Sequence, residues 1–360
     1  MAHSKRYIHS DSALGTPQDG RLGSVRETLL VVFLASILGA MSSQSRADWH
    51  HAEAAIMGTS VSVTLWSNDA AAATQAITLV MAEMRRLDAA LSTYNPASLV
   101  SKVNREAGSR MVEITPELAS IIDKSLYYSQ LSDGAFDISY ASVGKHYDYR
   151  LRHQPDAAER DALLPAINYD LIKLDAQQTH VRFANPDLQI GLGGIAKGYA
   201  VDRGITLLQE LGITSASISA GGDSRVLGDK RGKPWLVGIK NPRGRSAEDV
   251  AITLPLVNVA ISTSGDYERF FFDAQTQTRI HHILNPRTGT SVSGIASVSI
   301  IGPLGFDTDP LSTTVFVLGV EKGLALINGL EQYDAVIIDA AGVVHYSNGL
   351  EPASNDLASG

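Results

Sequence analysis

The chain has 360 residues, of which 44% are hydrophobic and 19% are charged, as is typical of a globular protein. Its formal net charge of −8, from 38 acidic and 30 basic residues, argues against general nucleic-acid binding, which usually requires a basic surface. It contains no cysteine, which excludes disulfides, thiol catalysis and lipid attachment through a cysteine. Any phosphate-binding site must therefore be built locally, from backbone amides, a few cations or a metal.

Residues 1–47 are predicted to be a cleaved signal peptide rather than part of the fold. An apolar run over residues 29–41 follows four basic residues and is too short to span a bilayer comfortably as a permanent helix. Ser45 and Ala47 are small residues at the −3 and −1 positions of a signal-peptidase site. We therefore expect a mature chain that begins near Asp48 and lies in the bacterial periplasm, where nothing forces the use of disulfides. A retained membrane anchor is the alternative.

The elements predicted for the first half of the mature chain are strands and amphipathic helices. Alternating apolar and polar residues indicate a half-buried strand, and apolar residues that recur every three or four positions indicate a helix. Residues 144–170 show neither pattern. In chain order, we expect a strand at 55–66, a helix at 70–91, a helix from the Thr115 cap and Pro116 to Ser132, and short strands at 179–183 and 189–192.

The second half continues from a glycine-rich segment, residues 191–202, which we call the glycine turn. In chain order, we expect a helix from Lys197 to Gly212, strands at 215–220, 235–239, 257–262 and 270–272, a loop at 281–289, a strand at 298–301, helices at 309–318 and 322–328, and a hairpin of strands 335–339 and 343–347. Strands and helices do not alternate strictly, so we expect an α+β fold with mainly antiparallel sheets. The fold should fill one domain, residues 48–351, before a loose tail at 352–360.

The glycine turn has the composition of an anion-binding site. Gly191, Gly193 and Gly194 allow a tight turn and a close approach by another group. The first amides of the following helix are unpaired and carry partial positive charge, to which Lys197 adds a mobile full charge. The alternative is an ordinary strand-to-helix turn with a surface lysine.

Two further patterns indicate chemistry. Asp309 and Thr313 are four residues apart on a predicted helix, so their oxygens lie on one face and suit Mg²⁺. Helix capping by Asp309 is the alternative. His282 stands in a loop that continues with Asn285-Pro286, and a histidine can accept a proton near neutral pH. A surface or structural histidine is the alternative there.

Taken together, these segments resemble the ApbE-like flavin transferases, the FAD:protein FMN transferases. Eight stretches match in the family's order and cover nearly all of the mature chain. They are Met57-Gly58-Thr59, Leu91-Ser92-Thr93-Tyr94, Gly134-Ala135-Phe136-Asp137, the segment from Gly193 to Asp202, Gly221-Gly222-Asp223, Thr263-Ser264-Gly265, His282-Ile283-Leu284-Asn285-Pro286 with Thr288-Gly289, and Asp309 with Thr313. The family usually has an acidic residue immediately before the Leu-Gly of the glycine turn, where this chain has Gly191.

The resemblance implies a phosphoryl-type transfer. FAD binds with its pyrophosphate on Mg²⁺, a threonine or serine hydroxyl of an acceptor protein attacks the FMN phosphorus, and AMP leaves. It implies that Lys197 faces the phosphates and that His282 is the base. The residues implied to contact FAD are Met57, Tyr94, Ala135, Phe136 and Asp137, and those implied to hold Mg²⁺ are Asp309, Thr313 and the carbonyl of Gly194. The implied acceptors are periplasm-facing subunits of membrane-bound redox complexes, with no nucleic-acid partner and at most peripheral contact with the membrane.

Three other functions are compatible with parts of the sequence. A flavin-binding assembly factor would keep the fold without the transfer, and an FAD hydrolase would release FMN and AMP without an acceptor. A periplasmic serine acyl-enzyme would use the S-x-x-K motif of Ser142 and Lys145, and Arg287-Thr288-Gly289 loosely matches K-T-G. No S-x-N element lies between these two motifs, which argues against the acyl-enzyme.

Overall fold

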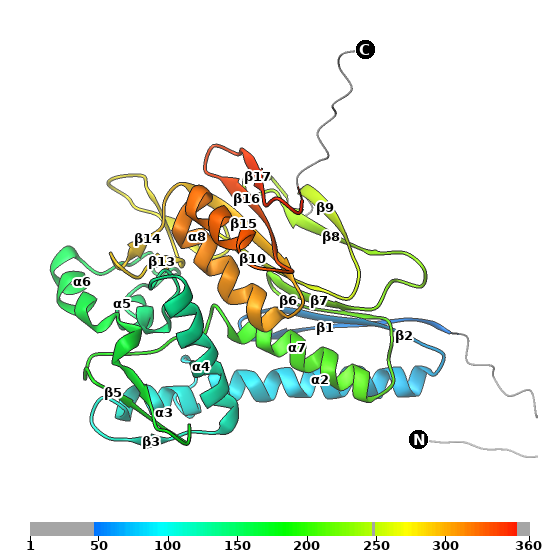
Figure 1. Cartoon of the computed structure of the whole chain (residues 1–360), viewed down its shortest axis with the longest axis horizontal. Coiled ribbons are helices and arrows are strands. Elements are labelled where there is room, and N and C mark those ends of the chain that lie inside the picture. The colour runs from blue at the N-terminus through cyan, green and yellow to red at the C-terminus, as the bar shows by residue number, and fades with distance from the viewer. Residues whose placement is uncertain (1–46, 247–248, 351–360) are drawn as a thin grey trace, which may run out of the picture. The chain divides into compact units, whose positions relative to one another are not determined.

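The computed structural model describes residues 47–246 and 249–350. The predicted signal peptide, except for Ala47, and the predicted tail lie outside the described residues. Between them, one large sheet carries three long helices, and a smaller region of short helices and strands lies beside it (Figure 1).

The large sheet has eight strands in the order β1-β2-β6-β7-β10-β15-β16-β17, and every neighbouring pair is antiparallel. This arrangement confirms the predicted α+β fold with antiparallel sheets. Its strands are β1 (Asp48–Ile56), β2 (Thr59–Ser67), β6 (Ala216–Ala220), β7 (Asp223–Leu227), β10 (Ala260–Gly265), β15 (Ile295–Gly302), β16 (Asp334–Asp339) and β17 (Val344–Tyr346).

Three helices cover one face of this sheet: α2 (Ala70–Leu91), α7 (Ala196–Glu210) and α8 (Gly305–Asn328). Apolar side chains of β2 and β15, among them Val63 and Ile300, join the helices in the main core. The opposite face is covered by a hairpin of β8 (Trp235–Lys240) and β9 (Val250–Leu256), whose Trp235 packs in a second core with Ile338. Strand β16 is therefore buried on both sides, with alternate residues in different cores, whereas one face of β1 and β2 is partly exposed.

The smaller region supplies the loops beside the start of α7. It contains helices α3 (Leu99–Glu106), α4 (Pro116–Leu131), α5 (Ala141–Gly144) and α6 (Ala157–Leu163), short 3₁₀ turns at Ile138–Tyr140, Leu164–Ala166 and Tyr169–Leu171, and a small sheet of β3 (Val112–Glu113), β5 (His180–Phe183) and β4 (Ile172–Leu174). Two further short hairpins pair β11 (Phe270–Phe272) with β12 (Arg279–His281) and β13 (Leu284–Asn285) with β14 (Thr290–Ser291).

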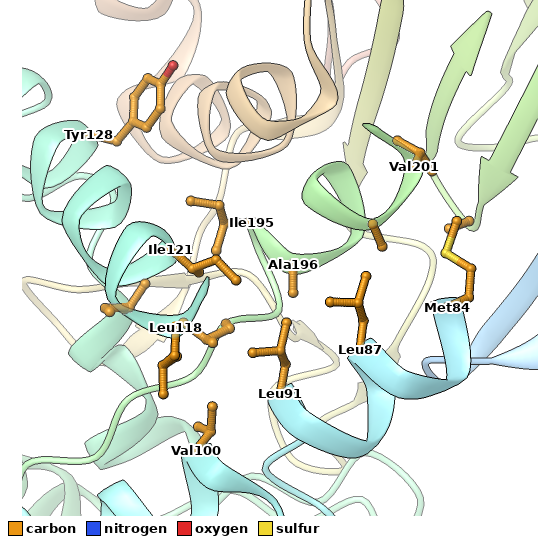
Figure 2. Close-up of a cluster of buried hydrophobic side chains, with 14 of the residues drawn as sticks. Met84, Leu87, Leu91, Val100, Leu118, Ile121, Tyr128, Ile195, Ala196 and Val201 are labelled. Atoms are coloured by element: carbon orange, nitrogen blue, oxygen red, sulfur yellow. The ribbon is translucent and has the colours of Figure 1, made fainter. Parts of the chain in front are cut away.

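A buried apolar cluster fixes the beginning of α7 (Figure 2). Ile195 and Ala196, which follow the glycines directly, pack with Leu87 and Leu91 of α2 and with Ile121 of α4. Burial of a leucine or isoleucine side chain stabilises a fold by about 1.5–3 kcal/mol. The glycine turn is thus held against a rigid core.

Helix α8 is long and apolar enough, by length and composition, to cross a membrane, and it is the one such helix among the residues that the structure describes. Within the fold it packs against α7, β10 and β15. Its side chains Leu311, Val315 and Phe316 are completely buried there. Its apolar character is therefore that of a core helix.

Several predicted elements agree with the structure. The helix at 70–91 is confirmed, as are the Thr115 cap, the helix that ends before Gly212 and the C-terminal hairpin. Helix α8 begins at Gly305 rather than Asp309, and Gly319 interrupts its helical backbone with a φ of 81°, near the predicted boundary between two helices.

Other predictions were wrong. Residues 55–66 form the end of β1 and most of β2, joined by a tight turn in which Met57 and Gly58 both have positive φ. Residues 189–192 form no strand, because the Asn104 side chain takes up the backbone N–H and C=O of Ile190. The strand expected at 257–262 begins only at Ala260. Helix α3 and strands β1, β7 and β9 were not predicted.

Candidate functional site

The glycine turn leads into α7 at the point where this helix meets α8. The backbone N–H of Gly198 donates a hydrogen bond to Oδ2 of Asp309, at 3.0 Å. A Cβ on Gly198 would lie 2.7 Å from the Cβ of Asp309, so only glycine allows this approach. The crossing therefore brings the first turn of α7, with Lys197, next to the acidic residue of α8.

Lys197 lies between two buried carboxylates. Its Nζ is 2.6 Å from Oδ2 of Asp223 and 3.6 Å from Oδ2 of Asp309. The side chain of Lys197 is 27% exposed, whereas those of Asp223 and Asp309 are 2% and 4% exposed. Lys197 is thus part of a charge cluster, and the alternative of an ordinary surface lysine is excluded.

This cluster carries one more negative charge than positive charge when both carboxylates are ionised. Burial, reinforced by the charge of Asp223, raises the pKa of Asp309 to about 7, although Lys197 and the N–H of Gly198 act to lower it. Burial alone would lower the pKa of Lys197, but the two carboxylates outweigh burial and raise it. Lys197 therefore remains cationic, and the cluster favours an additional cation.

Two of the predicted magnesium ligands, Gly194 and Thr313, lie against each other, and the third, Asp309, is on the same helix as Thr313. Thr313 follows Asp309 by one turn of α8, and its Oγ1 is 3.4 Å from Oγ of Ser264. A Cβ on Gly194 would lie 3.1 Å from the same Oγ1, which places the glycine backbone directly against Thr313. No three histidine, cysteine, aspartate or glutamate side chains gather as a metal site among the described residues. A carboxylate, a hydroxyl and a carbonyl oxygen are nevertheless hard donors that fit Mg²⁺, which keeps several water ligands.

His282 follows β12 in the loop that leads to β13. Its backbone N–H donates to the carbonyl of Arg269, while its side-chain Nδ1 is buried and has no hydrogen-bond partner among the described residues. Burial, together with the positive charge of Arg269, lowers the pKa of His282 to about 3. The imidazole is therefore neutral at neutral pH, and its unpartnered nitrogen can accept a hydrogen bond from an incoming hydroxyl.

The neighbouring His281 has the structural role that was the alternative for His282. His281 is 2% exposed, and its Nε2 lies 2.7 Å from the carbonyl oxygen of Val292. Its Nδ1 accepts a hydrogen bond from the N–H of Ile283, and its backbone N–H donates to Oγ of Ser291. Of the two adjacent histidines, His282 is the one with an unused ring nitrogen.

The residues predicted to contact FAD lie in different environments. Phe136 is buried, and its Cε2 lies 3.3 Å from the place of a Cβ on Gly194; Ala135 beside it is also buried. Met57 lies in the β1–β2 turn, where its N–H donates to Asp88. Tyr94, in contrast, is 87% exposed. Its ring is free to cover a ligand.

Asp137 is engaged within the protein. One carboxylate oxygen accepts from the N–H and the hydroxyl of Ser139, and the other accepts from the N–H of Tyr169. Burial raises its pKa, although these hydrogen bonds oppose the change. The structure therefore gives Asp137 a role in shaping the loop next to Phe136, and its contact with FAD stays a prediction.

The sequence analysis assigned no role to two acidic residues of this region. Asp223 pairs with Lys197, and Asp202 accepts hydrogen bonds from the N–H groups of Gly305 and Phe306 at the start of α8. Arg225 lies 2.6 Å from Asp202 and balances its charge. Both acids belong to the matched glycine-containing stretches, but their partners are distant in sequence.

The acyl-enzyme alternative fails on the position of Ser142. This serine is completely buried. Its Oγ donates to the carbonyl of Ser139 and accepts from the N–H of Gln189. It therefore cannot serve as an accessible nucleophile.

Comparison with known proteins identifies the same family. The sequence profile of the ApbE family matches residues 57–337. The FAD:protein FMN transferase of Klebsiella pneumoniae is 31% identical over 288 residues, which is 79% of this chain and 87% of that protein. The FAD:protein FMN transferase of Treponema pallidum is 29% identical over 333 residues, covering 86% of this chain and 90% of that protein.

Solved structures show the same fold. The crystal structure of the ApbE protein of Thermotoga maritima is 30% identical and superposes with a TM-score of 0.77 over 84% of this chain and 98% of that one. The apo flavinyl transferase ApbE of Pseudomonas stutzeri is 28% identical, with a TM-score of 0.72 over 84% and 95% of the two chains. On the match of profile, sequence and fold, the chain belongs to the ApbE family.

Proposed function

We propose that this protein is a transferase that moves FMN from FAD to a threonine or serine hydroxyl of an acceptor protein and releases AMP. The names of its relatives support flavin transfer. The observation that carries the proposal is the buried cluster of Lys197, Asp223 and Asp309 against the glycine turn, with a neutral histidine in the adjoining loop. Such a site can position and neutralise phosphates, which is what phosphoryl-type transfer requires most.

The magnesium ion belongs to this proposal. Asp309, Thr313 and the carbonyl of Gly194 would hold it, and the excess negative charge of the cluster supports its presence. When bound, the ion would neutralise charge on the phosphates of FAD. The remaining steps depend on the chain's own side chains.

Lys197 supplies a fixed positive charge, since Asp223 holds its ammonium group at 2.6 Å. The neutral ring of His282 takes the proton from the acceptor hydroxyl as that oxygen forms its bond to the FMN phosphorus. The bond between this phosphorus and the oxygen that bridges the two phosphates breaks, and the electron pair leaves with AMP. The acceptor retains FMN as a phosphoester.

The acceptor and the compartment are part of the same proposal. We assign the reaction to the periplasm, on the strength of the apolar run before Ala47 and the absence of cysteine. The acceptor class is a periplasm-facing subunit of a membrane-bound redox complex.

Incubation of the mature protein with FAD, Mg²⁺ and a candidate acceptor tests the proposal. Mass spectrometry of the acceptor should show the added mass of FMN, and chromatography should show one AMP for each modified acceptor. AMP and free FMN without any modified acceptor would indicate FAD hydrolysis. FAD binding without AMP would indicate an assembly factor. Either result would overturn transfer.

A further inference from the structure

We propose that Tyr140 is an FAD-binding residue whose hydroxyl donates a hydrogen bond to a phosphate oxygen of FAD. This hydroxyl lies where a side chain at residue 191 would lie if that residue were not glycine. The inference rests on the proposed function, because it assumes that FAD binds against the glycine turn. It adds a residue that lies outside the predicted set.

The ring of Tyr140 is wedged between two glycines. Its Cδ2 and Cε2 are each 3.1 Å from the place of a Cβ on Gly144. On its other side, Cε1 and Oη lie 3.3 Å and 3.2 Å from the place of a Cβ on Gly191. Nine in ten real Cβ contacts are longer than these distances, so a side chain at either position would shift the ring by a few tenths of an ångström. The ring is therefore held in one orientation.

This orientation carries the hydroxyl to the glycine turn. Oη lies 3.6 Å from the place of a Cβ on Gly193, the residue before the predicted magnesium ligand Gly194. Lys197 and Arg269 are close enough for their charges to act on the Tyr140 hydroxyl. A phosphate placed against the turn would thus meet backbone N–H groups, an ammonium group and this phenol together.

The hydroxyl of Tyr140 makes no hydrogen bond with any of the described residues, unlike those of several other tyrosines in the fold. Tyr128 donates to Asp307 at 2.7 Å, Tyr147 donates to the carbonyl of Gly289 at 2.9 Å, and Tyr199 donates to Glu117 at 3.1 Å. Burial raises the pKa of Tyr140, so the phenol keeps its proton. A protonated donor without a partner in the described part of the chain, on a half-buried residue beside an anion site, is available to a ligand.

The first test measures FAD affinity and thermal stability of the Tyr140→Phe variant in the presence of Mg²⁺. This change removes only the hydroxyl, so the dissociation constant of FAD should rise about tenfold while the melting temperature stays the same. Tyr147→Phe is the matched control. It loses a hydrogen bond to the Gly289 carbonyl, so its melting temperature should fall while its FAD affinity is unchanged.

A second variant tests the packing that orients the ring. Gly191→Ala should displace Tyr140 and weaken FAD binding to a similar degree. In a Tyr140→Ala background, the same change at residue 191 should weaken FAD binding much less, because only the contact with the Cβ of Ala141, at 3.1 Å, remains.

The outcomes separate this inference from the proposed function. If the unaltered protein does not bind FAD, the proposed function fails. If it binds FAD and Tyr140→Phe binds equally well, the role of Tyr140 is overturned while the proposed function stands. If Tyr140→Phe loses FAD affinity but its melting temperature falls as much as that of Tyr147→Phe, the Tyr140 hydroxyl has a structural role. That result would likewise overturn the inference.

Discussion

Gly198 of α7 and Gly305 of α8 approach so closely that a Cβ on Gly198 would lie 2.0 Å from the carbonyl oxygen of Gly305. The obstacle is backbone, which cannot rotate away as a side chain can. The Gly198→Ala change should therefore separate the two helices and lower the free energy of unfolding by about 3 kcal/mol. Urea denaturation measures this loss, and FAD affinity should fall as well because Asp309 depends on the same crossing.

Gly329→Ala is the control for this prediction. Gly329 has a φ of −87°, and its Cβ would meet other atoms only at 3.4 Å or more. The control should be close to the unaltered protein in stability. Equal unfolding free energies for the two alanine variants would contradict the role given to the helix crossing.

Replacement of His282 by alanine should stop transfer without preventing FAD binding. The ring nitrogen Nδ1 has no partner within the described residues, so its loss removes the proposed base without removing a hydrogen bond that Nδ1 makes there. General base catalysis contributes about 10²–10⁴ in rate, and kcat should fall by that factor. Single-turnover AMP release measures the rate, and undiminished turnover would remove the assignment of His282 as the base.

Asp309→Asn should raise the Mg²⁺ concentration needed for half-maximal activity by at least about tenfold, because it removes the charged ligand while preserving shape. Activity as a function of Mg²⁺ concentration, with EDTA as the zero point, gives the measurement. Asp307→Asn is the comparison: Asp307 is also buried on α8, but it is bonded to Tyr128 and Lys124. It should affect stability alone. Full activity in excess EDTA would contradict a metal requirement.

His282 should also make the fold sensitive to acid. Its folded-state pKa of about 3 lies below the ordinary 6.5, so between these values the unfolded chain binds a proton that the folded protein does not. Stability is therefore lost as the pH falls below 6.5, by about 2 kcal/mol between pH 7 and pH 5 for this one group. Urea denaturation of His282→Gln at both pH values should show a correspondingly smaller loss than the unaltered protein.

The stability of His282→Gln has to be compared with that of the unaltered protein, because the titration of Asp309 changes stability with pH in the opposite direction. Its pKa is raised to about 7, so the folded protein binds the extra proton and gains stability as the pH falls toward 3.8. His153→Gln, at an exposed position, should leave the acid sensitivity unchanged. The pH effect assigned to His282 fails if all three proteins lose the same stability between pH 7 and pH 5.

The features that the sequence predicted are those with a local signal. The helix at 70–91 has a regular apolar stripe, and Thr115-Pro116 is a recognisable helix start, so both were predicted correctly. The glycine turn, His282 and the pair Asp309 and Thr313 were identified from composition and spacing. The resemblance of eight ordered stretches then connected them to one family, which the comparisons confirm.

The remaining features depend on partners distant in sequence. Nothing near Asp202 indicates that it caps a helix about a hundred residues later, and Asp223 reveals its role only when Lys197 reaches it. The strand prediction at 189–192 was wrong for the same reason. Asn104, which accepts a hydrogen bond from the N–H of Ile190, lies more than eighty residues earlier in the chain. Tyr140 was missed because its importance comes from two glycines that leave room for its ring.

The residues of the candidate site range from Met57 near the first strand to Thr313 in the last helix, and α8 joins them to the centre of the large sheet. No single fragment of the chain contains them, so a nucleotide held here would bind only the completely folded polypeptide. FAD at a hundred times its dissociation constant should then stabilise the whole domain by about 2.7 kcal/mol. Occupancy by its own substrate would thereby protect residues 47–246 and 249–350 against proteolysis.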